Sequence, residues 1–476
     1  MELAPSFNKK ALLFLAVLLT PLIALIVANE WWEALFIPVG LLTLWLTMYR
    51  LDWAMWLIVF ATPISVNLTD LTGGAGLSLP TEPLLVLVTA ITLVKFFFFE
   101  EYDKRLLTHP ISIAIYVYLA WMLLTVITSQ LPLVSFKQWV TRVWFIVPYY
   151  FVLGHLFLKS ERNKQVFLWL FLVPLVIAGI YTIVIHSQYG FTKKTSTWVM
   201  FPLFKEHTSY GAVLAMFYPA ALYLTFRKSS WGFNAVAAVL LVILTAAIIL
   251  SYTRAAWLSL VGAGAVYLVY LFKMSRTVVW SLVGVVLIVA ALNFDFISSK
   301  FERNRTDSSD DFNEHVASVT NVSTDASNLE RINRWMCAIR MYQERPILGH
   351  GPGTYMFLYA PYQKPHEKTI ISTNAGNRGN AHSEYLSPLA ESGTLGLLTF
   401  LFLIYSVVYT SVATYQKLAS EKAKAFLRVA FLGLITYYLH GFLNNFLDMD
   451  KASAPFWGFT AMIAVLSISV RTAREE

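Results

Sequence analysis

The sequence predicts an all-α polytopic membrane protein with about 12 to 14 transmembrane helices and one large, partly helical loop on its outer side. Three observations predict this fold class. Hydrophobic residues make up 57% of the 476 residues and charged residues only 13%, which leaves too little polar surface for a soluble protein. Apolar runs of roughly 20 residues, the length that crosses a bilayer, recur along the chain. Basic residues punctuate these runs, as they do in membrane loops.

Fourteen apolar segments meet the length expected of a membrane span. The third is short and the sixth contains Lys137 and Arg142, so either is alternatively a re-entrant segment. The first follows Lys9 and Lys10 as a signal peptide would, but the second begins almost immediately, so we interpret the first as an uncleaved span. The segments cover residues 11–28, 32–49, 53–67, 81–99, 110–129, 136–158, 164–186, 207–226, 231–251, 254–273, 276–293, 385–410, 425–446 and 453–470.

The distribution of Lys and Arg predicts the orientation. The short loops 29–31, 67–81 and 129–135 contain neither residue. Because positive charge marks the cytoplasmic side of a membrane protein, both termini are expected to be cytoplasmic. The basic loops on that side contain Arg50, Lys104, Arg105, Lys159, Arg162, Lys164, Arg227, Lys228, Lys273, Arg276, Lys417, Lys422, Lys424, Arg471 and Arg474.

Three parts of the chain are expected. Residues 1–293 contain about eleven spans, residues 294–384 form an outer loop domain, and residues 385–476 contain about three more spans. Within the loop, the composition of residues 306–328 is typical of a mobile segment. The following residues 329–341 predict an amphipathic helix.

The predicted helix in the loop has an apolar face. Ile332, Trp335, Met336 and Ile339 share this face at helical spacing, with the arginines off it. Pro346 ends the helix, and the glycines from Gly349 to Gly353 predict a turn.

Ionisable residues gather at the outer ends of the predicted spans. Arg142 lies in the outer part of the sixth span, and His207 opens the eighth. Arg254 lies at the turn between the ninth and tenth, and His382 lies where the loop re-enters the membrane. The outer end of the thirteenth span carries His440, Asn444, Asn445 and Asp448.

Taken singly, each of these residues has a structural interpretation. An arginine at a helix end commonly reaches for lipid head groups, and a single histidine is commonly a hydrogen-bonding partner. Taken together, they form a polar layer on the outer side of the membrane, where the short loops contain no Lys or Arg. This layer is therefore the candidate site.

Arginine and histidine in one layer favour transfer from a diphosphate leaving group. The guanidinium fork matches phosphate oxygens, and a neutral histidine can accept a proton from an attacking sugar hydroxyl. Cationic side chains would then neutralise the departing charge. The single Cys337 excludes a multi-cysteine metal site, so we expect neither a metal nor a cofactor. Nucleic acid is not an expected partner, because the basic residues form no stripe or tail.

Several motifs in the second half of the chain resemble a known family. The segments 331–335, 345–355, 381–386 and 391–396 resemble the signature of the O-antigen ligase and O-antigen polymerase superfamily. Thr253-Arg254-Ala255 resembles the outer-face arginine motif of that family. The resemblance implies a bacterial inner-membrane glycosyltransferase of C-type architecture, with its active site at the periplasmic face.

The resemblance also implies the substrates. Such enzymes take a glycan from undecaprenyl diphosphate. The acceptor is the lipid A core in a ligase and another lipid-linked glycan in a polymerase. The expected partners are therefore the lipid-linked donor, one of these acceptors and the membrane lipid, and ligase is the preferred interpretation.

The residue roles follow from the same resemblance. His382 would be the general base, and Arg254 would be a catalytic residue that binds the donor diphosphate. Arg142, chosen for its position in the outer part of the sixth span rather than for a motif, completes the expected donor-binding group with His207 and Arg334. The chain departs from the family at Ser383, where Asn commonly follows the histidine.

Other functions remain open from the sequence. A polymerase or a protein O-oligosaccharyltransferase would share the same chemistry. A lipid-linked sugar flippase is the alternative from another class, although transporters usually carry repeats and polar residues near the bilayer midplane. The roles of His207 and of Glu391, nine residues after His382, are left open.

Overall fold

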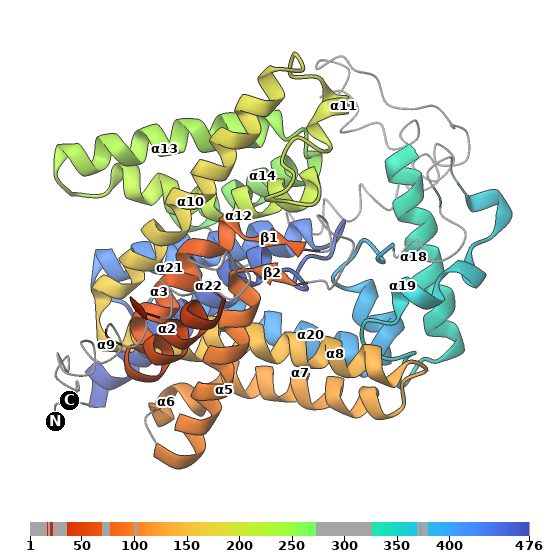
Figure 1. Cartoon of the computed structure of the whole chain (residues 1–476), viewed down its shortest axis with the longest axis horizontal. Coiled ribbons are helices and arrows are strands. Elements are labelled where there is room, and N and C mark those ends of the chain that lie inside the picture. The colour runs from red at the N-terminus through yellow and green to blue at the C-terminus, as the bar shows by residue number, and fades with distance from the viewer. Residues whose placement is uncertain are drawn as a thin grey trace.

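The computed structural model describes residues 36–68, 77–99, 102–272, 326–368 and 379–475, together with residues 17, 20, 21 and 372. The described part is almost entirely helical (Figure 1), with one small antiparallel pairing of β1 (Val66–Asn67) and β2 (Ser78–Leu79). The predicted spans 11–28 and 276–293, and residues 306–325 of the predicted mobile segment, lie outside the described residues apart from isolated positions in the first.

The longer helices follow the predicted spans closely. They are α2 (Phe36–Tyr49), α3 (Leu51–Ala61), α5 (Thr81–Phe99), α7 (Pro110–Ile127), α8 (Pro132–Ile146), α9 (Leu153–Lys159), α10 (Glu161–Ser187), α12 (His207–Phe226), α13 (Trp231–Leu250), α14 (Arg254–Leu271), α18 (Ala326–Glu344), α20 (Leu386–Tyr415), α21 (Glu421–His440) and α22 (Asp450–Glu475). Short helical turns complete the described fold: η2 (Thr62–Ile64), η3 (Val147–Val152), α6 (Lys104–Leu107), α11 (Lys193–Ser196), α19 (Tyr355–Leu358), η4 (Ala360–Tyr362) and η5 (Pro365–Glu367).

Within the described residues, nine helices are long and apolar enough to cross a membrane. The shorter helices α2 and α3 are also apolar. Helix α21 is 20 residues long but carries Glu421, Lys422, Lys424 and Arg428. The prediction of an all-α polytopic membrane protein is therefore confirmed.

The sixth predicted span is one continuous helix of 28 residues, Pro132–Lys159, and not a short re-entrant segment. A π-helical turn, η3, joins α8 to α9 around Pro148, which lacks a backbone donor. The tyrosines of this turn bond neighbouring helices: Tyr149 Oη lies 2.8 Å from Thr62 Oγ1, and Tyr150 Oη lies 2.8 Å from Ser112 Oγ. Such pairing is required because lipid offers no hydrogen bonds.

Helix α22 lies at the centre of the bundle. It contacts α21, α20, α12 and α9, and its side chains from Ala452 to Leu466 are buried on all sides. Figure 1 shows α10, α12, α13 and α14 on one side of the bundle and α7, α8 and α20 on the other. A helix that is apolar all round belongs in such a core position.

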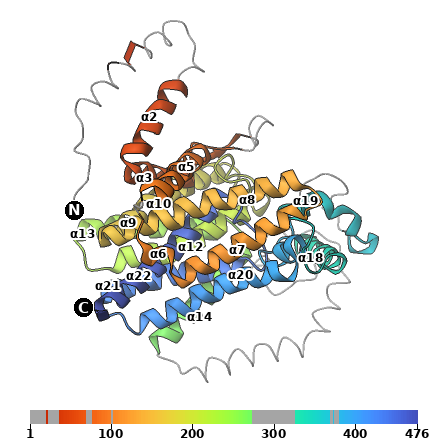
Figure 2. The same ribbon diagram turned by 90° about the horizontal axis from the view of Figure 1, so that it is seen from below.

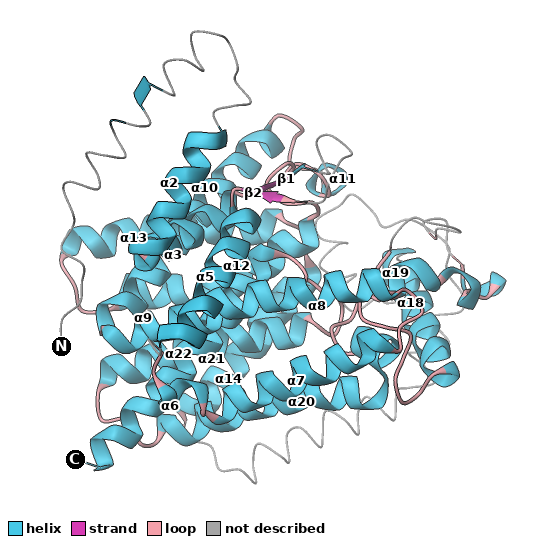
Figure 3. Cartoon of the chain, turned by 60° about the horizontal axis from the view of Figure 1, so that its bottom comes forward, coloured by secondary structure: helices cyan, strands magenta, loops and turns pink. Residues whose placement is uncertain are grey.

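The two ends of the bundle differ in chemistry. At one end, Lys422 Nζ lies 3.5 Å from Glu161 Oε2, which joins the basic starts of α21 and α10. At the other end, Thr253 Oγ1 donates to His207 O at 2.8 Å. Helices α18 and α19 lie beyond this second end, at the right of Figures 1 and 3 and also in the turned view of Figure 2. The second end carries the candidate site.

The predicted apolar face of the loop helix is not the buried one. In α18 the buried residues are Glu330, Asn333, Arg334, Cys337, Ala338 and Met341, whereas Met336 is 37% exposed. This face is mixed in character: Cys337, Ala338 and Met341 pack in an apolar cluster with Tyr355 and Ala390, and Asn333 Nδ2 donates to Gln363 Oε1 at 3.0 Å. Helical periodicity alone does not reveal a buried face that combines polar and apolar partners.

We expect Gly433→Ala to destabilise the bundle. A Cβ at Gly433 in α21 would lie 2.7 Å from Met216 O and 2.6 Å from Phe459 Cε2, so α12 or α22 would have to move, at a cost of about 1–3 kcal/mol. Gly232→Ala in α13 is the matched control, because a Cβ there has no neighbour within 4 Å. Thermal unfolding in detergent measures both variants. Equal melting temperatures would show that this close packing is absent.

Candidate functional site

The site is organised around the buried carboxylate of Glu384. Its Oε1 accepts hydrogen bonds from Tyr437 Oη at 2.5 Å, Phe446 N at 2.6 Å and Leu447 N at 2.9 Å. Glu384 N donates to Gly441 O at 2.8 Å. Burial raises the pKa of Glu384 above its ordinary value, against the opposing effect of Arg142. These bonds fasten the segment before α20 to the connection between α21 and α22.

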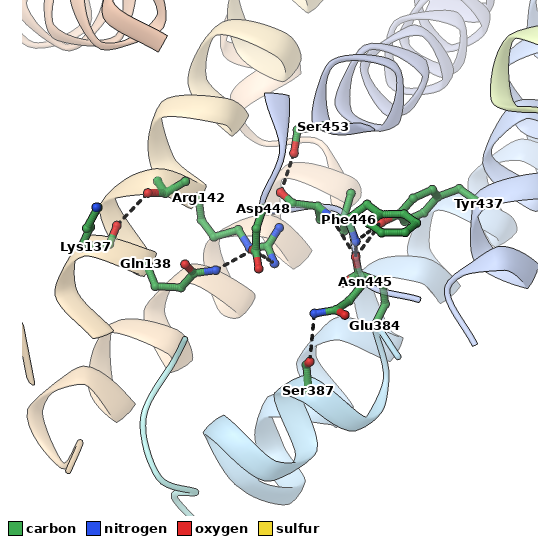
Figure 4. Close-up of polar contacts among 12 residues, drawn as sticks. Lys137, Gln138, Arg142, Glu384, Ser387, Tyr437, Asn445, Phe446, Asp448 and Ser453 are labelled. Atoms are coloured by element: carbon green, nitrogen blue, oxygen red, sulfur yellow. Dashed lines mark hydrogen bonds and ion pairs between the residues drawn. The ribbon is translucent and has the colours of Figure 1, made fainter. Parts of the chain in front are cut away.

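A cavity of about 70 Å³ lies beside this anchor and is lined by α7, α8, the glycine turn and the start of α20. Arg142 enters it from α8, and its Nη2 lies 2.8 Å from Asp448 Oδ1. Figure 4 shows these two side chains facing each other, with Gln138 Nε2 also donating to Asp448 Oδ1 at 2.5 Å. Within the described part of the chain, Nε and Nη1 of Arg142 are buried without a hydrogen-bond partner. Two guanidinium nitrogens, with three N–H groups between them, therefore remain for a ligand.

The glycine turn joins the loop to a break in α20. Gly349, Gly351 and Gly353 have φ values of +67°, +112° and +72°, a backbone region that favours glycine. Gly351 N donates to Glu391 O at 2.7 Å. Two residues later, Gly393 interrupts α20 with a φ of 71° and a ψ of −167°. The turn therefore connects the loop domain to the interrupted part of α20, and we do not interpret it as a phosphate-binding loop.

Glu391 lines the cavity at this break in α20. Its Oε1 accepts from Tyr355 N at 3.0 Å. Glu391 therefore lines the cavity two residues before the helix break at Gly393.

His382 lies on the segment that leads into α20. Its backbone has a φ of 48°, and the described residues contain only two other non-glycine residues with positive φ, Phe191 and Tyr252. Such strained positions cluster at functional sites. Trp335 Nε1 of α18 donates to His382 O at 3.2 Å, which ties the strained peptide to the loop domain.

The surroundings of His382 keep its imidazole neutral. Burial and the positive charges of Arg331 and Arg334 lower the pKa of His382 from 6.5 to about 4, while a hydrogen bond with the Asn444 side chain acts in the opposite direction. Among the described residues, Nδ1 of His382 is buried without a hydrogen-bond partner. The ring can therefore accept a proton at neutral pH.

Ser383 does not orient the imidazole. Its Oγ accepts from Tyr385 N and Leu386 N, each at 3.3 Å, and so caps the start of α20. Asn444, from the connection after α21, takes the position beside the ring.

Further cationic groups surround His382. Arg331 acts electrostatically on both His382 and His440, and His207 acts on His440 as well. Asn444 Nδ2 lies 3.1 Å from His440 Nε2. The structure thus brings His207 and His382, far apart in sequence, into one neighbourhood.

Arg254 lies at the first residue of α14, next to Thr253, whose hydroxyl bonds the backbone of His207. Gly211 permits this approach, because a Cβ there would lie 2.7 Å from Thr253 Cβ. Glu206 precedes α12, and burial raises the pKa of Glu206. Arg254 and His207 are therefore neighbours at the starts of two adjacent helices.

Arg334 is held inside the loop domain. Its Nε lies 2.7 Å from Glu330 Oε1, and its guanidinium carbon lies 3.9 Å from the centre of the Tyr359 ring. Of the sequence-predicted residues, Arg142 lines the cavity, Arg254 and His207 lie at the starts of α14 and α12, and His382 lies near Arg331 and Arg334. Arg334 acts on His382 by charge from the loop side.

Sequence reasoning gave no role to Glu384, Arg331 or Asn444 and did not find the pairing of Asp448 with Arg142. Glu384 could have been noticed as an acidic residue at the entry of an apolar helix, where an unpaired charge is costly. Within the part that the structure describes, no group of three or more His, Cys, Asp or Glu side chains is arranged to hold a metal ion.

The fold and the site define a polytopic membrane protein with an arginine- and histidine-rich site at one end of its helix bundle. Residues 238–401, about a third of the chain, match the family model described as O-Antigen ligase. The match supports a place for this part of the chain in the O-antigen ligase and polymerase superfamily, and it implies a membrane enzyme of the glycosyltransferase type. No curated protein matches the chain. Arg254, Arg334 and His382 lie inside the matched residues, and Arg142 and His207 lie before them.

We expect Glu384→Ala to destabilise the protein strongly and Glu384→Gln far less. Alanine leaves the Leu447 N–H group and the Tyr437 hydroxyl buried without an acceptor, at about 1–3 kcal/mol each, and leaves Phe446 N only its bond to Tyr437 Oη at 3.1 Å. The glutamine carbonyl can still accept. Thermal unfolding of the three proteins measures this order. Glu421→Ala removes an exposed carboxylate at the other end and should leave the melting temperature unchanged. Wild-type stability in Glu384→Ala would contradict the anchoring role.

Proposed function

We propose that this protein transfers a glycan from undecaprenyl diphosphate to a sugar of the lipid A core at the periplasmic face of the bacterial inner membrane. The observation that carries the proposal is the neutral imidazole of His382, with an unpartnered Nδ1 among the described residues, beside a group of cationic side chains. The match to the O-antigen ligase family supports the same chemistry. Both termini are then cytoplasmic, and the loop domain is periplasmic.

The cationic side would receive the donor diphosphate. Arg254 and His207 lie together at the starts of α14 and α12, where helix dipoles favour an anion. Arg254 is the main diphosphate ligand in this proposal because its guanidinium is planar and permanently charged. Arg334 contributes its charge from the loop domain while it remains paired with Glu330.

Arg142 would contact the substrate through Nε and Nη1, while Asp448 keeps Nη2 in place. Its surroundings also suit a sugar. The cavity carries the side chains of Asp448, Asn445, Ser387 and Gln138, which together offer acceptors and donors for hydroxyl groups.

In the chemical step, His382 accepts the proton of the acceptor hydroxyl as its oxygen attacks the anomeric carbon. A new glycosidic bond forms. The bond from the anomeric carbon to the diphosphate oxygen breaks, and undecaprenyl diphosphate leaves with that electron pair. The arginines stabilise the charge that develops on the leaving group, so the proposal needs no metal and no cofactor.

Two related functions share this mechanism. With a lipid-linked glycan as acceptor the protein would be a polymerase, and with a protein acceptor it would be an O-oligosaccharyltransferase. Product analysis separates the three: glycan on lipid A core, a longer lipid-linked glycan, or glycan on protein. A flippase would move the donor across the membrane and form no new glycosidic bond.

The direct test is transfer by the purified protein in excess chelator, with His382→Ala compared with wild type. We expect the variant to lose at least about 100-fold in rate, because a general base contributes that much or more, and to keep the wild-type melting temperature. His109→Ala is the matched control, since His109 is a buried histidine whose Nδ1 accepts from Ile111 N at 3.2 Å at the start of α7, the end of that helix away from the cavity. Wild-type turnover by His382→Ala would refute the assignment, and loss of activity in chelator would reveal a metal.

The pH dependence of kcat/KM should show an acidic limb at the low pKa of His382. A histidine with a pKa of about 4 stays neutral, and so able to accept a proton, when the pH falls below the ordinary value of 6.5. We therefore expect kcat/KM to be nearly constant from about pH 8 to about pH 5 and to fall below that. Melting temperatures at each pH control for unfolding. An acidic limb centred near pH 6.5 would show that the imidazole is not in the environment described.

A further inference from the structure

A second cavity lies at the opposite end of the bundle from the candidate site. It has a volume of about 610 Å³ and lies between α12, α14 and α21. Helices α12 and α14 begin at the site end and reach the cavity near their last turns, whereas α21 passes it near its first turns. The cavity is therefore separate from the residues proposed for glycan transfer.

The wall of this cavity is apolar and faces outward. Leu222 and Phe226 of α12 and Tyr267 of α14 line it, and they are 37%, 78% and 39% exposed. At Gly264, also in the wall, a Cβ would meet no atom within 4 Å. The groove thus offers open apolar space at the side of a membrane helix bundle, where lipid chains are the surrounding medium.

Two arginines close the far end of the groove. Arg227 follows α12, and Arg428 lies on α21, and both line the cavity. Among the described residues, neither guanidinium has an ion pair with a carboxylate, and Arg227 Nε is buried without a hydrogen-bond partner. The nearby acids are already paired, Glu161 with Lys422 at 3.5 Å and Glu421 with Lys424 at 2.7 Å.

These features require an occupant with an apolar chain and one anionic group at its end. The volume lies within the range of small-ligand sites, about 300–1,000 Å³. Arginine matches phosphate oxygens better than it matches a neutral or zwitterionic group. In the predicted orientation the arginines lie at the cytoplasmic leaflet, where basic residues attract anionic lipid.

We propose that this groove is a binding site for an anionic phospholipid, with an acyl chain along α12 and α14 and the phosphate between Arg227 and Arg428. The site does not depend on the proposed glycan transfer. It is a lateral lipid site that joins the three helices α12, α14 and α21 at the end away from the chemistry.

The test is native mass spectrometry of the purified full chain with added phosphatidylglycerol or phosphatidylcholine of identical chains. We expect phosphatidylglycerol to bind at least about tenfold more tightly, and Arg227→Gln with Arg428→Gln to remove most of that preference. Lys228→Gln is the charge control, since Lys228 is an exposed cation at the same end that does not line the groove. Gly264→Leu should block the chain of either lipid, and Gly232→Leu in α13, also in open space, is its control.

Each outcome decides the proposal. Loss of the preference in the double arginine variant, with Lys228→Gln unchanged, supports it, and so does loss of binding in Gly264→Leu alone. Equal binding of the two lipids by wild type, an equal loss in Lys228→Gln, or unchanged binding in Gly264→Leu overturns it. Tighter binding of a polyprenyl monophosphate than of phosphatidylglycerol overturns the assignment to a phospholipid. Because the readout is lipid binding, these results are independent of any transferase activity.

Discussion

The carboxylate of Glu384 holds together segments that lie far apart in the chain, and the geometry of the site depends on it. One oxygen accepts three hydrogen bonds from α21 and from the connection to α22. That connection supplies Asn444 to His382 and Asp448 to Arg142. A buried carboxylate left without these donors would be costly, so the same bonds that satisfy Glu384 also position the residues around it.

The second constraint is that lipid contains no water to bond backbone N–H and C=O groups, so these groups must be paired within the protein. The break of α20 at Gly393 is closed by protein groups: Trp121 Nε1 donates to Ser392 O at 2.9 Å, and Thr394 N donates to Pro346 O at 2.8 Å. Closing the break this way brings the loop domain against the bundle. It also leaves Glu391 in the lining of the cavity. An uninterrupted helix would satisfy its own backbone groups and would not need the loop as a partner.

The segment from Asn380 to Glu384 separates two chemically different regions. One contains Arg142, Asp448 and the hydrogen-bonding side chains of the cavity. The other contains His382 with its cationic neighbours. This arrangement suits a reaction between a polyhydroxylated acceptor and an anionic donor, with a neutral base between them. The apolar groove with Arg227 and Arg428 lies at the opposite end of the bundle, so the proposed lipid site and the proposed transfer site use different parts of α12, α14 and α21.

The sequence by itself determined the fold class and most helix ends, because a polar group in lipid is costly at each position whatever partners it later meets. Helices α5 and α12 begin where the apolar runs begin, at Thr81 and His207. Only the tertiary structure decided which partners meet. The buried face of α18 is one example, because the partners of Asn333 and Cys337 come from residues after the helix. The pairing of Arg142 with Asp448 and the place of Asn444 beside His382 arise from the packing of helices distant in sequence, and neither spacing nor hydropathy encodes such contacts.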